Sequence, residues 1–181
     1  FRADDVPCVG AIQDGQHFLM LRSWRMEWDN AGMDTSQPAP AALPELIGER
    51  LRLRAYRDDD TRAVFALYSD PQVTRYWSHP AWTERRQAED YIAARKALEL
   101  PAVHTWAVAD RHSDELVGTT TLFSLNGPQR RAEIGYSLLS AHQGKGYASE
   151  ALRLAIGHAF DIIGLERIEA DIDPRNLASC K

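Results

Sequence analysis

Apolar and polar residues alternate along five segments of the chain, which is the pattern of strands with one buried face. The first of these segments, Glu49–Tyr56, reads E-R-L-R-L-R-A-Y, so that leucine and arginine take turns. The other segments predicted as strands are His104–Ala109, Leu116–Phe123, Arg131–Leu139 and Arg167–Ile172. Polar turns separate the middle three, as is typical of antiparallel neighbours in a sheet.

Apolar residues recur at spacings of three and four in other segments, which predicts helices. A first helix is expected to start near Thr61, where Asp58–Asp60 supply capping side chains. A second is expected from Glu84 to about Leu98, with Thr83 as its N-cap. Both fall between the first and second predicted strands.

A third and longer helix is expected over Tyr147–Ile163, with Gly164 as its C-cap. The predicted order is therefore strand, helix, helix, three antiparallel strands, helix, strand. Hairpin connections combined with one long crossover helix indicate a mixed α+β or α/β sheet flanked by helices.

Composition narrows the class of protein. The 181 residues suffice for one domain, with 44% hydrophobic and 26% charged residues and a formal net charge of −5. This acidic balance argues against a general nucleic-acid binder, which needs surplus basic residues. No apolar stretch is long enough for a membrane span, no secretory leader is seen, and the six histidines lack metal-ligand spacing. We therefore expect a cytoplasmic protein without a metal.

The segment Leu139–Glu150, L-S-A-H-Q-G-K-G-Y-A-S-E, carries the clearest chemical signal. It leaves a predicted strand, passes two glycines and enters the long helix, where free N–H groups and the helix dipole favour a phosphate or diphosphate. Glycines that simply permit a tight turn are the alternative. The spacing fits neither a P-loop nor a dinucleotide fingerprint, whose third glycine is replaced by Ser149.

Glu133–Leu152 resembles motif A of the GCN5-related N-acetyltransferases, and more narrowly their ribosomal-protein N-terminal acetyltransferase (RimJ/RimL-type) branch. The family pattern Gln/Arg-x-x-Gly-x-Gly/Ala is matched at Gln143, Gly146 and Ala148. The resemblance continues at the family's Asn-x-x-Ser segment, Asn176 and Ser179, and in the opening strand, Leu43–Arg54. It spans residues 43–181 and implies an acyl-CoA N-acyltransferase fold with a mostly antiparallel, twisted sheet.

The two ends of the chain depart from the family pattern. The family fold continues past the Ser179 segment, whereas residues 1–32 read like its closing hairpin, with Asp14-Gly15 as the turn. We expect residues 1–32 to be the C-terminal hairpin of the same domain in apparent circular permutation, with the Pro-rich residues 33–42 as a linker or native N-terminus starting at Met33. A numbering artefact would leave the same trace, and an unrelated hairpin is the alternative.

The resemblance also implies how acetyl-CoA, the acetyl donor, is bound. Main-chain N–H groups of residues 143–148 would hold its pyrophosphate, and those around Leu138 and Leu139 the pantetheine arm and the thioester carbonyl. Asn176 would bind the same arm, or else serve only as a turn residue. The residues expected at the cofactor are Leu138, Leu139, Gln143, Gly144, Lys145, Gly146, Tyr147, Ala148 and Asn176. Lys145 would add charge or simply be solvated.

Two residues are candidates for moving protons. Glu133 would be the general base, because partial burial would raise its pKa, although it could also be a solvated strand carboxylate. Asp171 and Glu169 are weaker alternatives. Ser179 would protonate the leaving thiolate or, instead, cap a helix. Cys180 reads as a small buried residue rather than a nucleophile, since direct transfer in a ternary complex needs none.

Aromatic residues could line an amine pocket, with Trp77, Trp82 and Tyr136 as substrate-binding candidates, although such residues are more often core. Tyr76 and Trp106 belong to the same group. The resemblance implies N-acetylation of a primary amine, with a protein N-terminal α-amine as first choice. An antibiotic, polyamine or metabolite amine is the alternative acceptor, and a non-catalytic acyl-CoA-binding regulator is the alternative function. A monomer and a homodimer are both compatible with the sequence.

Overall fold

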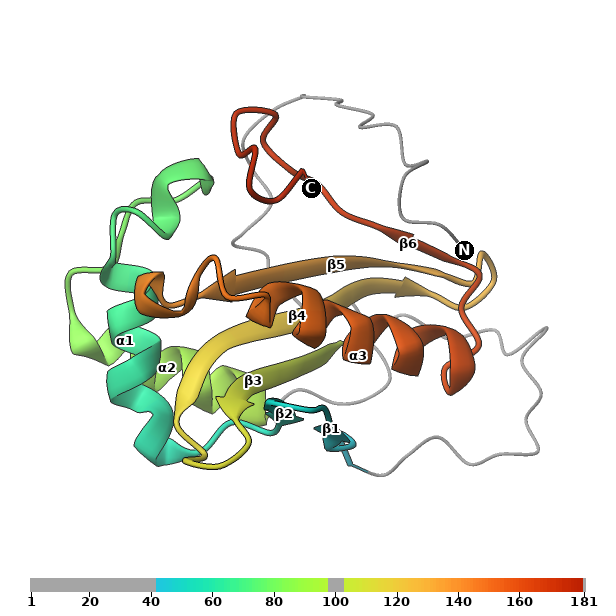
Figure 1. Cartoon of the computed structure of the whole chain (residues 1–181), viewed down its shortest axis with the longest axis horizontal. Coiled ribbons are helices and arrows are strands. Elements are labelled where there is room, and N and C mark those ends of the chain that lie inside the picture. The colour runs from blue at the N-terminus through green and yellow to red at the C-terminus, as the bar shows by residue number, and fades with distance from the viewer. Residues whose placement is uncertain (1–41, 98–102, 181) are drawn as a thin grey trace.

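The computed structural model describes residues 42–97 and 103–180 (Figure 1). The predicted hairpin at residues 1–32 and nearly all of the predicted linker lie outside these residues. The described strands are β1 Leu46–Ile47, β2 Leu51–Arg54, β3 His104–Asp110, β4 Leu116–Asn126, β5 Arg131–Leu138 and β6 Arg167–Glu169. The helices are α1 Thr61–Ser69, α2 Arg85–Lys96 and α3 Tyr147–Asp161, with short 3₁₀ turns η1 Asp58–Asp60, η2 Thr74–Tyr76 and η3 Ser140–His142.

The strands of the described part form one sheet in the order of the chain, β1 to β6. Neighbours from β1 to β5 pair antiparallel, and β5 and β6 pair parallel. Parallel neighbours need a crossover, and α3 supplies it. The mixed, mostly antiparallel sheet flanked by helices that the sequence predicted is confirmed.

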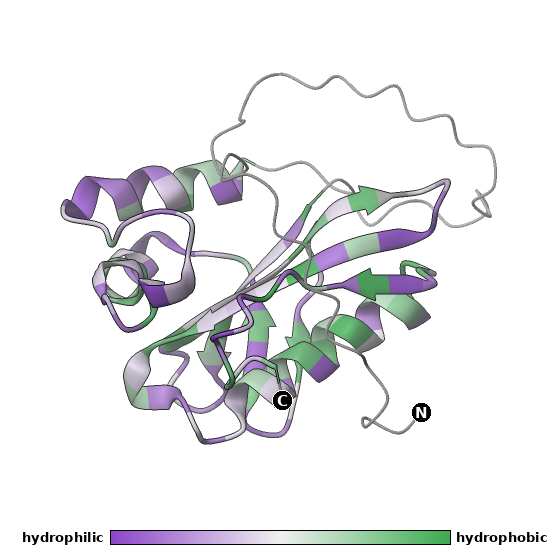
Figure 2. Cartoon of the chain, turned by 90° about the horizontal axis from the view of Figure 1, so that it is seen from above, coloured by the Kyte–Doolittle hydropathy of each residue, from purple (hydrophilic) through white to green (hydrophobic). Residues whose placement is uncertain are grey.

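Helices cover both faces of the sheet, with α3 on one side and the α1–α2 pair on the other (Figure 2). This double cover explains why residues 104–109 of β3 are all buried, although the sequence alternates there. Trp106 has no exposed surface, and its Nε1–H donates to the carbonyl of Pro44 at 2.8 Å. Trp106 is therefore a core residue and lines no amine pocket.

Small residues bring α3 close to the sheet. Ala151, Ala155 and Ala159 are almost fully buried and recur every four residues along one side of the helix. They pack on a mostly aliphatic sheet surface that includes Leu51, Leu53, Val108, Val117, Leu122, Ala132 and Ile134. Gly164 follows the helix with a φ of 77°, the left-handed conformation expected of a C-terminal glycine.

The α1–α2 side has a different core, formed around Tyr56, Leu67, Tyr68 and Ile92. Where the α3 side has an aliphatic sheet surface, the α1–α2 side has a buried ion pair. Arg54 is 5% exposed, and its guanidinium bonds Asp60 through two N–H groups at 2.8 and 2.9 Å. These hydrogen bonds to Asp60 raise the pKa of Arg54 above its usual range.

Two helix caps differ from the sequence prediction. Asp60 was expected to cap α1, but its carboxylate makes no cap bond because it binds Arg54 and the amide of Arg57. Thr83 was expected to cap α2, whereas Glu84 takes that place in a capping box with Gln87.

Candidate active site

The sheet opens between β5 and β6. Pairing joins only residues 131–133 of β5 to residues 167–169 of β6. Beyond that point the chain after β6 rises away from β5 (Figure 1). Residues 134–138 of β5 therefore present one edge of their backbone toward this opening, with no partner strand there in the described part of the chain.

The hydrogen bonds at the end of β5 show which amide faces the opening. The N–H of Leu139 donates to the carbonyl of Val117 at 3.0 Å and is thus used inside the sheet. Successive residues of a strand direct their N–H groups to opposite edges, so the amide of Leu138 faces the side of β6. Of the two leucines that the sequence proposed for the donor's arm, Leu138 is the one with a free edge.

A glycine turn joins β5 to α3. Gly144 and Gly146 have φ angles of 71° and 77°, a conformation that other residues adopt only with strain. A Cβ built on Gly144 would meet no atom within 4 Å, so open space lies beside it. The backbone conformation, and not close packing, requires the glycine at this position.

The turn ends at an uncapped helix start. Gly146 is the N-cap of α3 and has no side chain to satisfy the first amides. The first helical bond runs from the N–H of Glu150 to the carbonyl of Gly146, at 3.1 Å. The amides of Tyr147, Ala148 and Ser149 precede this bond and therefore lack helical acceptors. Together with the helix dipole they form a site that fits a diphosphate.

Side chains on either side hold the turn in place, and one of them comes from the end of α1. Gln143 donates from Nε2 to the carbonyl of Leu138 at 3.1 Å, which ties the turn back to β5. The hydroxyl of Ser140 donates to the Asp70 carboxylate at the end of α1, and this bond lowers the pKa of Asp70. The imidazole of His142 stacks on Tyr147, with ring centroids 5.8 Å apart. The predicted loop residues are thus gathered at one place.

Aromatic side chains gather on the other face of the sheet, between α1 and α2. Tyr68 lies at their centre, with ring centroids 5.3 Å from Trp77, 4.6 Å from Trp82 and 5.2 Å from Tyr91. Its hydroxyl lies 3.1 Å from that of Tyr91 and 3.3 Å from Oγ1 of Thr119. Burial raises the pKa of Tyr68 well above its usual range, so the phenol stays protonated.

Strand alternation separates two of the predicted site residues. Glu133 is half-buried on the face of β5 that also carries Ser137, whose hydroxyl lies 3.1 Å from that of Thr119 beneath Tyr68. Tyr136 lies on the opposite face, the side of α3. The structure thus brings Glu133 to the side of Trp77 and Trp82 and places Tyr136 apart from them.

The turn after β6 contains the last two predicted residues. The carbonyl of Asn176 accepts hydrogen bonds from the amides of Ser179 and Cys180, at 3.0 and 3.2 Å. Asn176 thus shapes this turn, and no described helix begins at Ser179. Arg175 bonds Asp173, which lowers the pKa of Asp173 to about 2, and lies 5.9 Å from the ring centroid of Tyr76 in η2. The turn therefore lies near the aromatic side of the sheet.

Comparisons with known proteins identify the family of this chain. The acetyltransferase (GNAT) domain family matches residues 50–181. This chain is a GNAT-family N-acetyltransferase. It is 36% identical over 140 residues to the uncharacterized N-acetyltransferase p20 of Bacillus licheniformis, covering 77% of this chain and 79% of that one. The family prediction is confirmed, and the ribosomal-protein branch stays a prediction.

Two further proteins resemble the acetyltransferase, one in structure and one in sequence. A GNAT-family acetyltransferase structure from Bacillus anthracis superposes with a TM-score of 0.66 at 25% identity, covering 74% of this chain and 76% of that chain. The spermidine N(1)-acetyltransferase of Escherichia coli is 28% identical over 131 residues, covering 70% of this chain and 66% of the relative.

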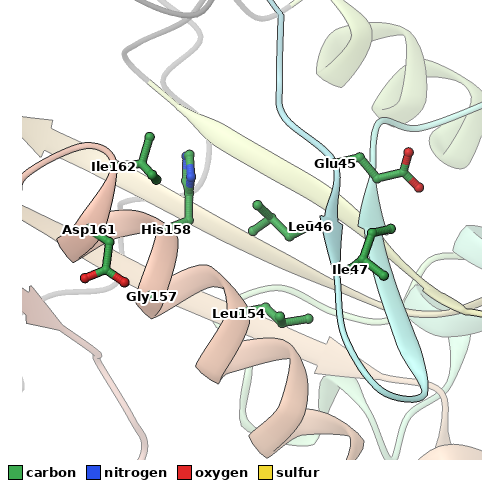
Figure 3. Close-up of a pocket in the computed structure, with 8 residues that line it drawn as sticks. All are labelled: Glu45, Leu46, Ile47, Leu154, Gly157, His158, Asp161 and Ile162. Atoms are coloured by element: carbon green, nitrogen blue, oxygen red, sulfur yellow. The ribbon is translucent and has the colours of Figure 1, made fainter.

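A shallow groove of about 310 Å³ lies between β1 and the C-terminal half of α3 (Figure 3). Leu46, Ile47, Leu154 and Ile162 give it an apolar lining, and Glu45 and Asp161 lie at its ends. None of the residues predicted for the acetyltransferase's active site lines this groove. The groove is thus a separate feature of the α3 side.

Two buried histidines lie next to each other on the α3 side, and one of them, His158, also lines the groove. His104 and His158 are 2% and 6% exposed, with ring centroids 5.5 Å apart. Burial, and to a smaller extent the neighbouring His158, lowers the pKa of His104 to about 4, and burial lowers that of His158. Within residues 42–97 and 103–180, no three His, Cys, Asp or Glu side chains come together as a metal site would require. In the same ranges no helix is long and apolar enough to cross a bilayer.

Sequence reasoning missed one pair at the acetyltransferase's glycine turn, Arg50 and Glu150. The buried carboxylate of Glu150 accepts a hydrogen bond from Arg50 Nε at 2.8 Å, and Arg50 in turn donates to the carbonyl of Lys145. One hundred residues separate the two in sequence, so no local pattern joins them. The signal available was a glutamate in the first turn of an otherwise apolar helix side.

Proposed function

We propose that this acetyltransferase binds acetyl-CoA along the opening between β5 and β6 and passes the acetyl group directly to the N-terminal α-amine of a protein. The observation that carries the proposal is the uncapped start of α3 behind Gly144 and Gly146, at the end of the unpaired edge of β5. A diphosphate carries the charge that such a helix start attracts.

The donor's remaining parts are assigned to neighbouring residues. The free edge of β5 near Leu138 offers N–H and C=O groups to the amide-containing pantetheine arm, and the amide of Leu138 polarises the thioester carbonyl. Asn176 lies in the turn that follows β6, on the other side of the opening, and takes part through its side-chain amide. Lys145 adds positive charge at the tip of the turn.

The chemical step needs a neutral amine and a proton for the leaving group. Glu133 accepts a proton from the ammonium, directly or through a water molecule. The amine nitrogen attacks the thioester carbonyl carbon, the C–N bond forms and the C–S bond breaks. Ser179 then donates a proton to the departing thiolate and is reprotonated by the proton that the nitrogen of the tetrahedral adduct loses, so that acetylated amine and CoA are the products. Neither side chain forms a covalent intermediate.

An α-amine suits a site with one carboxylate base. Its ordinary pKa is about 8, against about 10.4 for a lysine-like amine, so a substantial share is already neutral near neutral pH. The aromatic group around Tyr68, with Trp77 and Trp82 half-buried beside it, offers apolar surface to the first residues of a peptide.

A polyamine is the second candidate acceptor, and one observation favours it. Glu133 lies on β5 and Asp171 just after β6, at the edge of the opening, where a multivalent cation would find partners, whereas Glu169 is paired with Arg131 and Arg167. The spermidine N(1)-acetyltransferase relative is consistent with this acceptor. Asp171 would then bind a charge that does not react, while Glu133 serves as the base.

The test follows the release of free thiol from acetyl-CoA with a panel of acceptors. Peptides with a free N-terminus are compared with the same peptides blocked at that amine, and with spermidine. Thiol release that needs the free α-amine supports the proposal, and release with spermidine alone replaces it with the polyamine function. Tight CoA binding without thiol release on any acceptor would make the chain an acyl-CoA-binding regulator.

A further inference from the structure

We propose that Arg50 is a positioning residue of the donor site, which fixes the glycine turn through the carbonyl of Lys145 and offers its remaining guanidinium nitrogen to the diphosphate of CoA. This rests on the proposed use of the turn for acetyl-CoA. Arg50 lies just before β2, far in sequence from the turn, and so belongs to no loop motif.

The first step of the argument is the anchor of Arg50. Glu150 is 7% exposed, and its Oε1 accepts the backbone amides of Arg50 and Leu51 at 2.7 and 3.1 Å, while its Oε2 accepts Arg50 Nε at 2.8 Å. Burial by itself raises the pKa of Glu150, but these hydrogen bonds outweigh it and lower the pKa. The carboxylate is therefore charged at neutral pH and holds the guanidinium in one orientation.

The second step is the contact with the turn itself. Arg50 Nη1 donates to the carbonyl of Lys145 at 2.9 Å, and Lys145 lies between the two left-handed glycines. The guanidinium carbon also lies 4.9 Å from the ring centroid of Tyr147, the first residue of α3. With its carbonyl held by Arg50, the peptide that follows Lys145 is restricted in rotation, and this fixes the direction of the next amide, that of Gly146.

The third step concerns the nitrogen that these bonds leave over. Arg50 Nη2 takes no part in the bonds to Glu150 and Lys145, and it would lie 3.4 Å from a Cβ placed on Gly146. A side chain at residue 146 would therefore touch this nitrogen. The Arg50 side chain is 45% exposed, so a ligand can reach it from solvent. A fork of N–H donors is suited to phosphate oxygens.

The experiment measures the dissociation constant of CoA by calorimetry for the unaltered chain, Arg50→Met, Arg50→Lys and Arg111→Met. Arg111 is the matched control, because it is an exposed arginine whose guanidinium bonds the carbonyl of Gly48 and, among the described residues, makes no hydrogen bond to the turn. Its backbone amide, which donates to the carbonyl of Arg50 at 2.8 Å, is kept in Arg111→Met. We expect Arg50→Met to weaken CoA binding about 30-fold, Arg50→Lys about 5-fold and Arg111→Met less than 2-fold.

Salt separates a direct charge contact from a structural role. Between about 50 mM and 500 mM NaCl the loss in Arg50→Met is expected to shrink to less than about 10-fold, because an exposed contact with phosphate is screened. A loss that stays constant with salt, with no rescue by lysine and a fall of more than about 10 °C in the melting temperature, would overturn the proposal in favour of a purely structural role.

The two proposals fail in different ways. If the unaltered chain does not bind CoA, the donor-site assignment falls, and the role of Arg50 falls with it. If the unaltered chain binds CoA and Arg50→Met binds it equally well, the role of Arg50 alone is wrong. With an active acceptor in hand, Arg50→Met should raise KM for acetyl-CoA about 10-fold or more and leave kcat within about 3-fold.

Discussion

The two faces of the sheet are packed with different kinds of side chain. On the α3 side, three alanines let the helix lie close to an aliphatic surface, and the helix start projects a turn of backbone amides toward the opening. On the α1–α2 side, a buried ion pair and a group of aromatic rings linked by hydroxyls fill the same role. The first side uses backbone geometry that tolerates only glycine and small residues, and the second uses side-chain chemistry.

In the function proposed above, this difference separates the site of the acetyl donor from that of the acceptor. A diphosphate is recognised by main-chain groups, which any sequence with the right turn can supply, so the donor site is common to a family. Acceptors differ in size and charge, and we expect the aromatic side chains of the α1–α2 face to vary without moving the turn, which is tied to that side through the bond from Ser140 to Asp70. Each prediction below changes one face and asks whether the other responds.

The largest effect is expected from removing the buried charge on the α1–α2 side. Arg54→Met leaves Asp60 without the two bonds to the guanidinium, and the free energy of unfolding should fall by about 3–5 kcal/mol. Urea denaturation measures it, with the exposed Arg62→Met in α1 as control, expected within about 0.5 kcal/mol. Equal stability of the two variants would mean that this face does not depend on the ion pair.

The next prediction changes the donor turn. Gly146→Val forces a β-branched residue into a left-handed conformation, and CoA affinity should fall at least 100-fold, about 2.7 kcal/mol. The matched control is Gly157→Ala inside α3, whose added Cβ would meet only Asp161 Oδ2 at 3.9 Å. The control should bind CoA normally, and its free energy of unfolding should be about 0.5–1 kcal/mol higher than that of the unaltered chain. Unchanged affinity in Gly146→Val would contradict the diphosphate assignment.

A third prediction uses pH on the α3 side. Because the pKa of His104 is lowered to about 4, the unfolded chain binds a proton more readily than the folded chain below pH 6.5. Stability should therefore be full above pH 6.5 and fall by about 2 kcal/mol between pH 7 and pH 5 from this residue. His104→Leu should flatten that part of the pH profile of unfolding, and an unaltered slope would contradict the assignment.

The smallest effect is expected from the neighbouring hydroxyls of Tyr68, Tyr91 and Thr119 on the α1–α2 side. Tyr68→Phe removes the contacts with Tyr91 and Thr119 and should lower stability by about 1 kcal/mol. Calorimetry should show CoA affinity within 2-fold of the unaltered chain, because the Tyr68 hydroxyl bonds Tyr91 and Thr119 and not the turn, which meets α1 through Ser140 and Asp70. A larger loss of CoA affinity would show that the two faces are coupled and that the comparison above is too simple.

The sequence predicted the glycine turn and the helix after it better than the grouping of the aromatic residues, for a physical reason. The turn is contiguous, and its glycines and the helix that follows are visible in the residues from Gln143 to Tyr147. On the α1–α2 side, Tyr68, Trp77, Trp82 and Tyr91 come from separate elements, and only the folded structure shows which of them meet. Strand alternation could have separated Tyr136 from Glu133, because the two are three residues apart on β5.

Long-range partners were the other gap. The hydrogen bond between Glu150 and Arg50 joins residues that lie far apart in the sequence. The aspartates before α1 were predicted to cap that helix, whereas Asp60 binds Arg54. From sequence alone a charged residue has several possible partners, and burial in the folded chain decides which of them it binds.

The central claim is tested most directly by a crystal structure of the chain grown with CoA. The account predicts the diphosphate within hydrogen-bond distance of the amides between Gly144 and Ala148, with the pantetheine arm running along β5 toward Leu138. A diphosphate bound elsewhere, with those amides facing only water or side chains of the turn, would contradict it.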